Sequence, residues 1–551
     1  MRTRWSGWAR SAVVMVIAIA LVASYFLFGF SSGALPEAQP SVASTIQTPP
    51  AVEASGPLPG VPTVAISEHA TWDDVEQLNP DRQLDADAGA AAAALPQPLG
   101  EDLASYWDQS VEWSPCGAQL CASVLAPLDW EEPGRAAVEI AMRKLPSSES
   151  SKGPLFVNPG GPGYGGQAFA VSLGVDAWKG YDIIGWDPRG TGESSRVECG
   201  TTEQTDGVFQ LDGSPDDEDE KAALVDGWSG FARQCRDASG DLLDHLTTIE
   251  NVRDLDLLRH LLGADKLNFL GVSYGTYVGA VYAELFPERT GRMVLDSAVN
   301  ITNDKEAPSQ STGFELALRN YALWCADTEP CRLGDTADEV VDRIATFLAG
   351  LDEQPIPVGN RTLTQGLAAA GVAFYLYSDE KSYPGLTFAA TDAMDGRASD
   401  LLGAADKLNG RGRDSYKTVA FAFPATRCVD GADEGIAAAD RKWREKKARS
   451  SVFAANMGMD FVCETWTADS APRLKLTAHG APPILVVGTT GDSATPYEHA
   501  VSMAEQLESG VLLTFDGVGH GAVTSGNECV AAAVTTYLVD EAVPEDGTVC
   551  E

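Results

Sequence analysis

The chain has little positive charge for its length. It holds 39 lysines and arginines against 79 aspartates and glutamates in 551 residues, which gives a formal net charge of −40. A fold this acidic repels phosphate backbones, so nucleic acid is not an expected partner. The excess of acid predicts a solvated acidic surface, and it would also suit neutral or cationic substrates.

Metal-binding cysteine motifs are also missing. None of the ten cysteines forms a CxxC pair, so we expect no zinc site, and the sequence implies no other metal or organic cofactor. An even number of cysteines fits disulfides formed in an oxidising compartment. Sequence alone does not fix their connectivity. Our expectation is that sequential neighbours pair, as Cys116–Cys121, Cys199–Cys235, Cys325–Cys331, Cys428–Cys463 and Cys529–Cys550.

The N-terminus indicates export. Three arginines among the first ten residues precede an uncharged stretch from Ser11 to Phe30. A stretch of about twenty residues is long enough to span a bilayer, with its basic end in the cytoplasm. We favour an uncleaved membrane anchor at 1–30, and a signal peptide cleaved near 31–34 is the alternative. No cysteine follows the stretch, which excludes a lipoprotein anchor. The protein is therefore expected outside the cytoplasm, tethered or secreted.

The rest of the chain divides by its patterns. Residues 31–98 are rich in alanine, proline, serine and aspartate and predict a linker. Strand and helix patterns then alternate over 99–301 and again over 471–551, which predicts a mainly parallel sheet flanked by helices. Within the first part, the acidic stretch 212–221 is expected to be a loop. Between them, 302–470 is mostly helical by pattern. We predict a helical cap inserted after a strand, where it could cover the ligand-binding carboxyl ends of the sheet.

A serine in the first part carries a nucleophile motif. Gly271, Ser273 and Gly275 match GxSxG, with a strand pattern running into the motif and a helix pattern leaving it. This order is the nucleophile elbow of α/β-hydrolases, and flanking glycines relieve its crowding. The motif alone is weak in a glycine-rich chain, where an inert serine in a turn is the alternative. Its context predicts Ser273 as the nucleophile.

A serine nucleophile needs a base, and the chain has six histidines. His520 follows a late strand in GlyValGlyHisGly, on a loop that could reach the serine. His499 falls on a predicted helix, where we expect it to face solvent. The order serine, acid, histidine requires the base to come last in the chain. His520 is therefore the predicted base.

The acid that orients the histidine should precede it. Asp492 follows the strand IleLeuValValGly, and Thr495 with Pro496 predicts the cap and first residue of the next helix. Asp492 thus lies on a strand–helix loop, where a carboxylate could turn toward the imidazole. Asp296, at the end of an earlier strand, and Asp516 are the alternatives.

Acyl transfer also needs two donors for the oxyanion. One should be the amide of Tyr274, just after the nucleophile. The second should come from the loop after Val157, where Gly160 and Gly161 allow a close approach and the two prolines have no amide hydrogen. We favour Gly161.

The same loop contains a rival motif. Gly161, Gly163 and Gly166 match the GxGxxG of dinucleotide-binding turns, and Asp187 ends the next strand. Pro162 inside the turn and the intact order of the triad both argue against this alternative.

Together these motifs resemble those of the secreted tripeptidyl aminopeptidases, α/β-hydrolase serine peptidases related to prolyl aminopeptidase. The resemblance covers about residues 100–550, with one departure at Thr467, where the family pattern has proline. The matching segments are AsnProGlyGlyProGly (158–163), TrpAspProArgGlyThrGlyGluSer (186–194), GlyValSerTyrGlyThr (271–276), ThrArgCysValAsp (426–430), CysGluThrTrp (463–466), ValValGlyThrThrGlyAspSerAlaThrPro (486–496) and GlyHisGly (519–521).

The resemblance implies an α/β-hydrolase fold and release of short peptides, such as tripeptides, from free N-termini through an acyl-enzyme. The residues alone predict only an acyl hydrolase. An esterase or lipase acting on small acyl esters would share every catalytic residue, and a binding protein on an inactive hydrolase scaffold is a third hypothesis. An aminopeptidase needs an anion to hold the substrate ammonium. Asp430 and Glu464, beside Cys428 and Cys463, are candidates, and ordinary surface carboxylates are the alternative.

Overall fold

The computed structural model describes residues 95–551 except 175–176, 303–306, 329, 432–434, 449–451, 457–460 and 472. The described residues belong to one compact unit. The predicted anchor at 1–30 and nearly all of the predicted linker lie outside them. Among the described residues, no helix has both the length and the apolar character needed to cross a bilayer.

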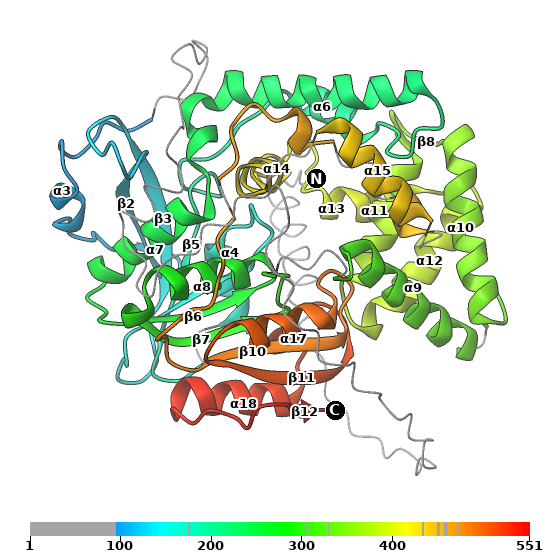
Figure 1. The fold of residues 1–551 in the computed structure, drawn as a ribbon. Coiled ribbons are helices and arrows are strands. Elements are labelled where there is room, and N and C mark those ends of the chain that lie inside the picture. The colour runs from blue at the N-terminus through cyan, green and yellow to red at the C-terminus, as the bar shows by residue number, and fades with distance from the viewer. Residues whose placement is uncertain are drawn as a thin grey trace, which may run out of the picture. The chain divides into compact units, whose positions relative to one another are not determined.

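A ten-stranded sheet forms the centre of this unit (Figure 1). Its strand order is β1-β2-β3-β5-β4-β6-β7-β10-β11-β12. The pairs from β1 to β5 are antiparallel, and every pair from β5 to β12 is parallel. The strands are β1 (Ser114–Cys116), β2 (Gln119–Pro127), β3 (Ala137–Leu145), β4 (Pro154–Asn158), β5 (Asp182–Trp186), β6 (Leu267–Val272), β7 (Thr290–Asp296), β10 (Ile484–Gly491), β11 (Gly510–Val518) and β12 (Thr548–Cys550).

Helices cover both faces of the sheet, which confirms the predicted α/β-hydrolase class. In β4, Leu155 and Val157 point to one core and Phe156 to the other, and all three are fully buried. Such continuous apolar strands are typical of parallel sheets buried on both sides. The first core is closed by α4 (Gly166–Leu173) and α18 (Glu528–Val539), and the second by α7 (Thr248–Leu261), α8 (Tyr274–Leu285) and α17 (Tyr497–Gln506).

One predicted loop is wrong in part. The acidic stretch 212–221 was expected to be a loop, but α6 (Glu218–Ser239) begins inside it. The Asp217 carboxylate accepts hydrogen bonds from the amides of Asp219 and Glu220, which caps the helix. Acidic residues in a first turn also stabilise the positive end of a helix dipole, so the acidic run starts α6. Shorter elements before α7 are α3 (Ala104–Trp107), α5 (Thr202–Phe209) and η1 (Gly240–His245).

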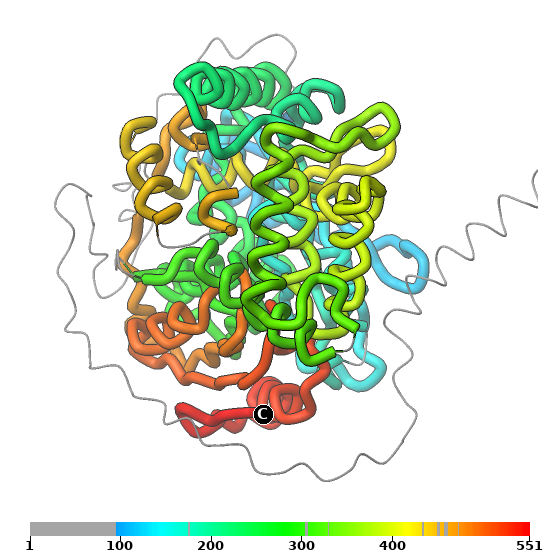
Figure 2. The backbone as a smooth tube through the Cα atoms, turned by 90° about the vertical axis from the view of Figure 1, so that its right-hand side faces the viewer, coloured from blue at the N-terminus to red at the C-terminus, as the bar shows by residue number. Residues whose placement is uncertain are grey.

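The segment between β7 and β10 is largely helical, and we call it the insertion. In Figure 1 its helices α9 to α13 gather beside the sheet, and Figure 2 shows them toward the viewer. These helices share a hydrophobic core of their own, which includes Phe314, Ile344 and Leu401. The elements are α9 (Gln310–Asp327), α10 (Ala337–Glu353), β8 (Ile356–Val358), β9 (Arg361–Leu363), α11 (Gln365–Leu376), α12 (Tyr383–Met394), α13 (Ser399–Leu408), α14 (Val419–Asp430), α15 (Ile436–Lys447) and α16 (Phe453–Asn456).

Disulfides join all ten cysteines. Such bonds persist in oxidising compartments, so they indicate an extracytoplasmic protein. The bonds are those between sequential neighbours, Cys116–Cys121, Cys199–Cys235, Cys325–Cys331, Cys428–Cys463 and Cys529–Cys550.

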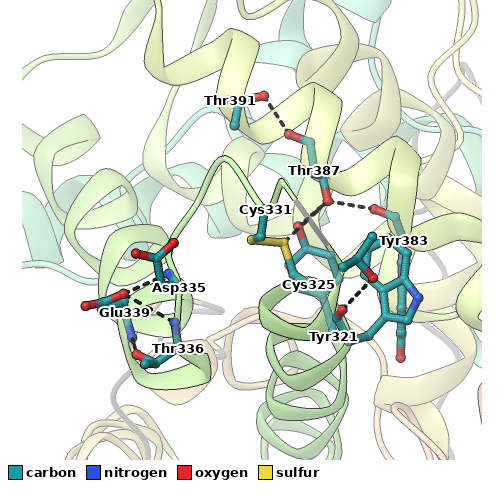
Figure 3. Close-up of a disulfide and its surroundings, with 11 residues drawn as sticks. Tyr321, Cys325, Cys331, Asp335, Thr336, Glu339, Tyr383, Thr387 and Thr391 are labelled. Carbon is teal, nitrogen blue, oxygen red and sulfur yellow. Dashed lines mark hydrogen bonds between the residues drawn. A yellow bond between two sulfur atoms is a disulfide. The ribbon is translucent and has the colours of Figure 1, made fainter.

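One of these bonds lies at the end of α9 (Figure 3). Cys325, in the last turn of α9, is joined to Cys331 in the loop that follows. Tyr321 lies one turn earlier on α9, and Thr387 lies on α12. Their hydroxyl groups are 2.7 Å apart, and the Thr387 hydroxyl also donates to the Tyr383 carbonyl at 3.1 Å. The Tyr321–Thr387 hydrogen bond therefore links α9 to α12, and the disulfide fixes the end of α9 to the loop that follows it.

Candidate active site

The predicted nucleophile stands on a strained turn. Ser273 lies between the end of β6 and the start of α8, with φ 58° and ψ −126°. A non-glycine residue in this region is uncommon and is found mainly at functional sites. A methyl group on Gly271 would lie 2.3 Å from the carbonyl oxygen of Gly275, so the close approach requires glycine. The predicted strand–turn–helix therefore surrounds Ser273.

The predicted acid and base lie on adjacent loops, at the carboxyl ends of β10 and β11. His520 Nδ1 is 2.8 Å from Asp492 Oδ1 and 3.0 Å from Asp492 Oδ2. Asp492 Oδ1 also accepts hydrogen bonds from the amides of Ala494 and Thr495, each at 2.9 Å. Asp492 is only 1% exposed, so these contacts fix its carboxylate against the imidazole.

The two side chains change each other's protonation. Burial alone raises the pKa of Asp492, but the charge of His520 and the hydrogen bonds outweigh it, so the pKa is lowered. Burial alone lowers the pKa of His520, but the charge of Asp492 and the hydrogen bond to it raise that pKa above its ordinary value. The pair therefore favours an imidazolium beside a carboxylate, which is the state formed when a base takes a proton.

The end of β7 holds the nucleophile and base loops together. The main-chain oxygen of Asp296 accepts the Ser273 amide at 2.9 Å, and its carboxylate accepts the amides of Ala522 and Val523 at 3.1 and 2.9 Å. Burial raises the pKa of Asp296 to about 6, although these amides lower it. Asp296 was the alternative acid, yet its carboxylate bonds to main-chain amides. The sequence indicated its place at a strand end, but not these partners.

Ser297 extends this arrangement to the acid loop. Its hydroxyl accepts the Gly521 amide at 2.8 Å, and its carbonyl accepts the Thr495 hydroxyl at 3.0 Å. The sequence predicted that Thr495 caps the next helix, and that prediction is wrong. Instead α17 begins at Tyr497, with Pro496 in the capping position.

Ser273 and His520 come from loops that meet beside Val272. A methyl group on Gly521 would lie 3.9 Å from the Val272 side chain. Between the described side chains of Ser273 and His520 there is no hydrogen bond. Catalytic hydrogen bonds are often long in free enzymes and shorten when substrate binds, so this arrangement is compatible with their predicted roles.

The loop after β4 lies directly against the nucleophile turn. A methyl group on Gly160 would lie 2.9 Å from the Tyr274 nitrogen. The Gly160 amide is already used, because it donates to Asn158 Oδ1 at 2.8 Å. The Gly161 amide makes no hydrogen bond to any residue that the structure describes. Tyr274 is the first residue of α8, where the helix supplies no acceptor. Neither amide therefore has an acceptor among the described residues, as their predicted role as oxyanion donors requires.

The rival dinucleotide motif is occupied by internal contacts. A methyl group on Gly166 would lie 2.4 Å from the Trp186 carbonyl oxygen, so this glycine serves close packing. The Asp187 carboxylate accepts hydrogen bonds from the amides of Gln167 and Glu193 and from the Gln167 side chain. Asp187 therefore fixes the loop and is not positioned to bind a ribose.

Asp430, the first candidate for binding a substrate ammonium, is connected to the nucleophile turn. Its carboxylate accepts the Thr248 amide at 2.8 Å and the Thr248 hydroxyl at 2.5 Å. The Thr248 hydroxyl is also hydrogen-bonded to the Tyr274 hydroxyl. Burial, and then the charge of Asp430, raise the pKa of Tyr274. Glu464, the second candidate, lies half-buried in η4 (Cys463–Thr465), which the Cys428–Cys463 disulfide joins to α14.

Two other residues that were weighed as base or acid, His499 and Asp516, have partners other than Asp492 and His520. His499 was expected to face solvent, but it is only 8% exposed, and its Nε2 donates to the Pro308 carbonyl at 2.7 Å. That expectation was wrong, because the side chain faces the segment before α9. Asp516, the weaker alternative acid, is exposed and accepts the Thr490 hydroxyl at 2.8 Å.

One group of side chains in the described residues has the composition of a metal site. Ligand atoms of Asp129, His245 and Glu250 lie within 4.8 Å of one another. Glu250 Oε1 already contacts His245 Nδ1 at 2.7 Å, and the same oxygen lies 3.8 Å from Arg189 Nη1. A cation could bind only by displacing these contacts, so we assign no metal to the group.

Comparison with known proteins gives several relatives that span most of the chain. The family described as "TAP-like protein" matches residues 450–550. Serine protease Hip1 of Mycobacterium tuberculosis is 33% identical over 479 residues, which cover 80% of this chain and 91% of that protein. Tripeptidyl aminopeptidase of Streptomyces lividans is 32% identical over 486 residues, covering 83% and 88%. Carboxylesterase B of Mycobacterium tuberculosis is 32% identical over 544 residues, covering 95% and 96%.

Proposed function

The chain belongs to the tripeptidyl aminopeptidase family of α/β-hydrolases, and on this premise we propose that it is a serine aminopeptidase that releases short peptides, such as tripeptides, from free N-termini. The observation that carries the proposal is the contact of His520 with the buried Asp492, on loops that meet the strained Ser273 turn. The chemistry this supports is hydrolysis of an acyl bond through a covalent intermediate.

In the proposed reaction, the Ser273 hydroxyl attacks the scissile carbonyl while His520 takes the hydroxyl proton. Asp492 holds the imidazole in the required tautomer and stabilises its cation. The amides of Tyr274 and Gly161 bind the oxyanion of the tetrahedral intermediate. His520 then gives its proton to the leaving amine. In the second step His520 takes a proton from a water molecule that attacks the acyl-enzyme, and it returns this proton to the Ser273 oxygen as the acyl group leaves.

We propose Asp430 and Glu464 as the anions that hold the substrate ammonium. Asp430 has the stronger support, because it reaches the residue after the nucleophile through Thr248 and Tyr274. Glu464 has the support of the disulfide that joins its segment to the same helix.

The remaining parts of the chain fit an exported enzyme. We propose that 1–30 is a membrane anchor or signal peptide, 31–98 a linker and 302–470 a cap on a core made of 99–301 and 471–551. The disulfides support a location outside the cytoplasm. For the cap, the support is that α9 to α16 all lie between β7 and β10, whose carboxyl ends carry Asp296 and Asp492.

Tripeptide anilides test the peptidase proposal. Release of the chromophore should be rapid from substrates with a free N-terminus and much slower from N-acetylated versions, because acetylation removes the cation that the acidic site would bind. Ser273→Ala should abolish both. Equal cleavage of free and acetylated substrates would contradict an aminopeptidase.

A second candidate function is hydrolysis of small acyl esters. It is favoured by the relative named carboxylesterase B, which aligns with 95% of this chain. Measuring kcat/KM for nitrophenyl esters beside the anilides separates the two functions. An enzyme that cleaves esters but no free tripeptide anilide would be an esterase.

A further inference from the structure

One residue of the insertion contacts the predicted base directly. Tyr377 follows α11, and its carbonyl accepts the main-chain amide of His520 at 2.9 Å. The rings of the two residues also pack edge to face, with centroids 5.6 Å apart and planes at 77°. Tyr377 therefore touches both the main chain and the imidazole of the base.

The segment that follows Tyr377 also packs against the loop of His520. A methyl group on Gly519 would lie 3.1 Å from the Asp379 nitrogen, so the residues after Tyr377 press on the loop just before the base. A side chain at position 519 would crowd this segment, so the loop and the segment pack closely here. The loop and the segment 377–379 form one packed surface.

Helix α9 supports the tyrosine from behind and reaches the acid loop. Phe314 packs edge to face on Tyr377, with ring centroids 5.1 Å apart and planes at 72°. A methyl group on the neighbouring Gly313 would lie 2.5 Å from the Ser493 carbonyl oxygen and 3.1 Å from that of Asp492. The insertion is therefore packed against both the acid and the base.

The hydroxyl of Tyr377 takes no part in this arrangement. It makes no hydrogen bond within the described part of the chain. Burial raises the pKa of Tyr377 far above its ordinary value, and the nearby Tyr164 and Asp492 raise it further, so the hydroxyl stays neutral. The contacts to His520 come from the ring and the carbonyl, which phenylalanine would preserve.

We infer that Tyr377 is a positioning residue for the catalytic base, so that the insertion orients His520 in addition to any role as a cover. The inference rests on the proposed roles of Ser273 and His520. The carbonyl fixes the main chain of His520, and the ring limits rotation of the imidazole toward or away from Ser273. Misplacing a catalytic group by about 1 Å can cost about 100-fold in rate, so a loosened imidazole should be slow.

The test compares Tyr377→Phe with Tyr377→Ala by the second-order rate of inactivation with a small fluorophosphonate. This probe needs the serine and the base but none of the peptide subsites. Tyr377→Phe should react at close to the wild-type rate. Tyr377→Ala should react about 10- to 100-fold more slowly, and its kcat for a tripeptide anilide should fall by a similar factor with little change in KM.

Two further variants separate positioning from stability. Tyr383→Leu removes another tyrosine of the insertion core, which packs on Tyr321 and Trp324, so it should lower thermal stability but leave the inactivation rate of the folded protein unchanged. Tyr377→Leu keeps apolar volume if the alanine variant fails to fold, and it should also react slowly.

Wild-type reactivity in the folded alanine or leucine variant would overturn the inference, as would an equal loss in Tyr383→Leu. A wild-type protein that reacts with the probe but cleaves no tripeptide anilide would instead contradict the proposed function and leave the role of Tyr377 supported if its variants react slowly.

Discussion

At the scale of single residues, the proposed reaction needs an imidazole of His520 that is neutral before it takes the Ser273 proton and charged while it holds that proton. Burial lowers the pKa of His520, but the charge of Asp492 and the hydrogen bond to it outweigh burial, so this pKa lies above 6.5. We therefore expect kcat/KM to fall as the pH drops through a value above 6.5, where the base becomes protonated. A pH–rate profile of tripeptide anilide cleavage measures this limb.

Asp492→Asn should lower kcat by about 10,000-fold, because the amide no longer holds the reactive tautomer. Any fall in the remaining activity at acid pH should move to lower pH. Burial lowers the pKa of His520, and the charge of Asp492 would no longer be there to raise it. Asp516→Asn is the matched control on the neighbouring strand, and it should change neither quantity. Near-normal activity in Asp492→Asn would show that another group orients the base.

At the scale of elements, Asp296 at the end of β7 connects the loop that carries Ser273 to the loop that carries His520. Asp296→Asn should destabilise the fold by about 1–3 kcal/mol below pH 4 and lower kcat. The asparagine NH2 group would face one of the Ala522 and Val523 amides and cannot accept it, whereas the hydroxyl oxygen of the protonated acid keeps a lone pair that can. The pKa of Asp296 is raised to about 6 in the fold, so the folded state disfavours its ionised form. Its ionisation therefore removes stability as the pH rises between about 4 and 6.

The difference in unfolding free energy between wild type and Asp296→Asn should consequently narrow across that pH window. Urea denaturation of both proteins at the two ends of the window measures it. A difference that widens with rising pH would mean that the carboxylate is more stable ionised inside the protein than in the unfolded chain.

At the scale of the whole molecule, the sequence predicted what short segments determine. The sheet class, the Ser273 turn and the place of Asp492 and His520 on strand ends follow from local patterns of apolar residues, glycine and proline. Contacts between distant segments left no such pattern. The bond from His520 to the Tyr377 carbonyl, the partners of Asp296 and the burial of His499 each depend on segments that only the fold brings together.

Residue type alone also misled at two places. The run of acids near Glu218 suggested a loop, yet it starts a helix whose dipole favours negative charge. Thr495 suggested a helix cap, but its hydroxyl donates a hydrogen bond to the Ser297 carbonyl. In both cases the side chain suits either role, and its neighbours in space decide.

The proposed reaction requires Ser273 to be a nucleophile that His520 activates. Treatment of the full-length protein with a fluorophosphonate probe, followed by peptide mapping, tests this most directly. We predict one labelled peptide carrying the probe on Ser273, no labelling in Ser273→Ala, greatly slowed labelling in His520→Ala, and normal labelling when the exposed Ser172 is changed to alanine. Label on another serine, or undiminished labelling of Ser273→Ala, would contradict it.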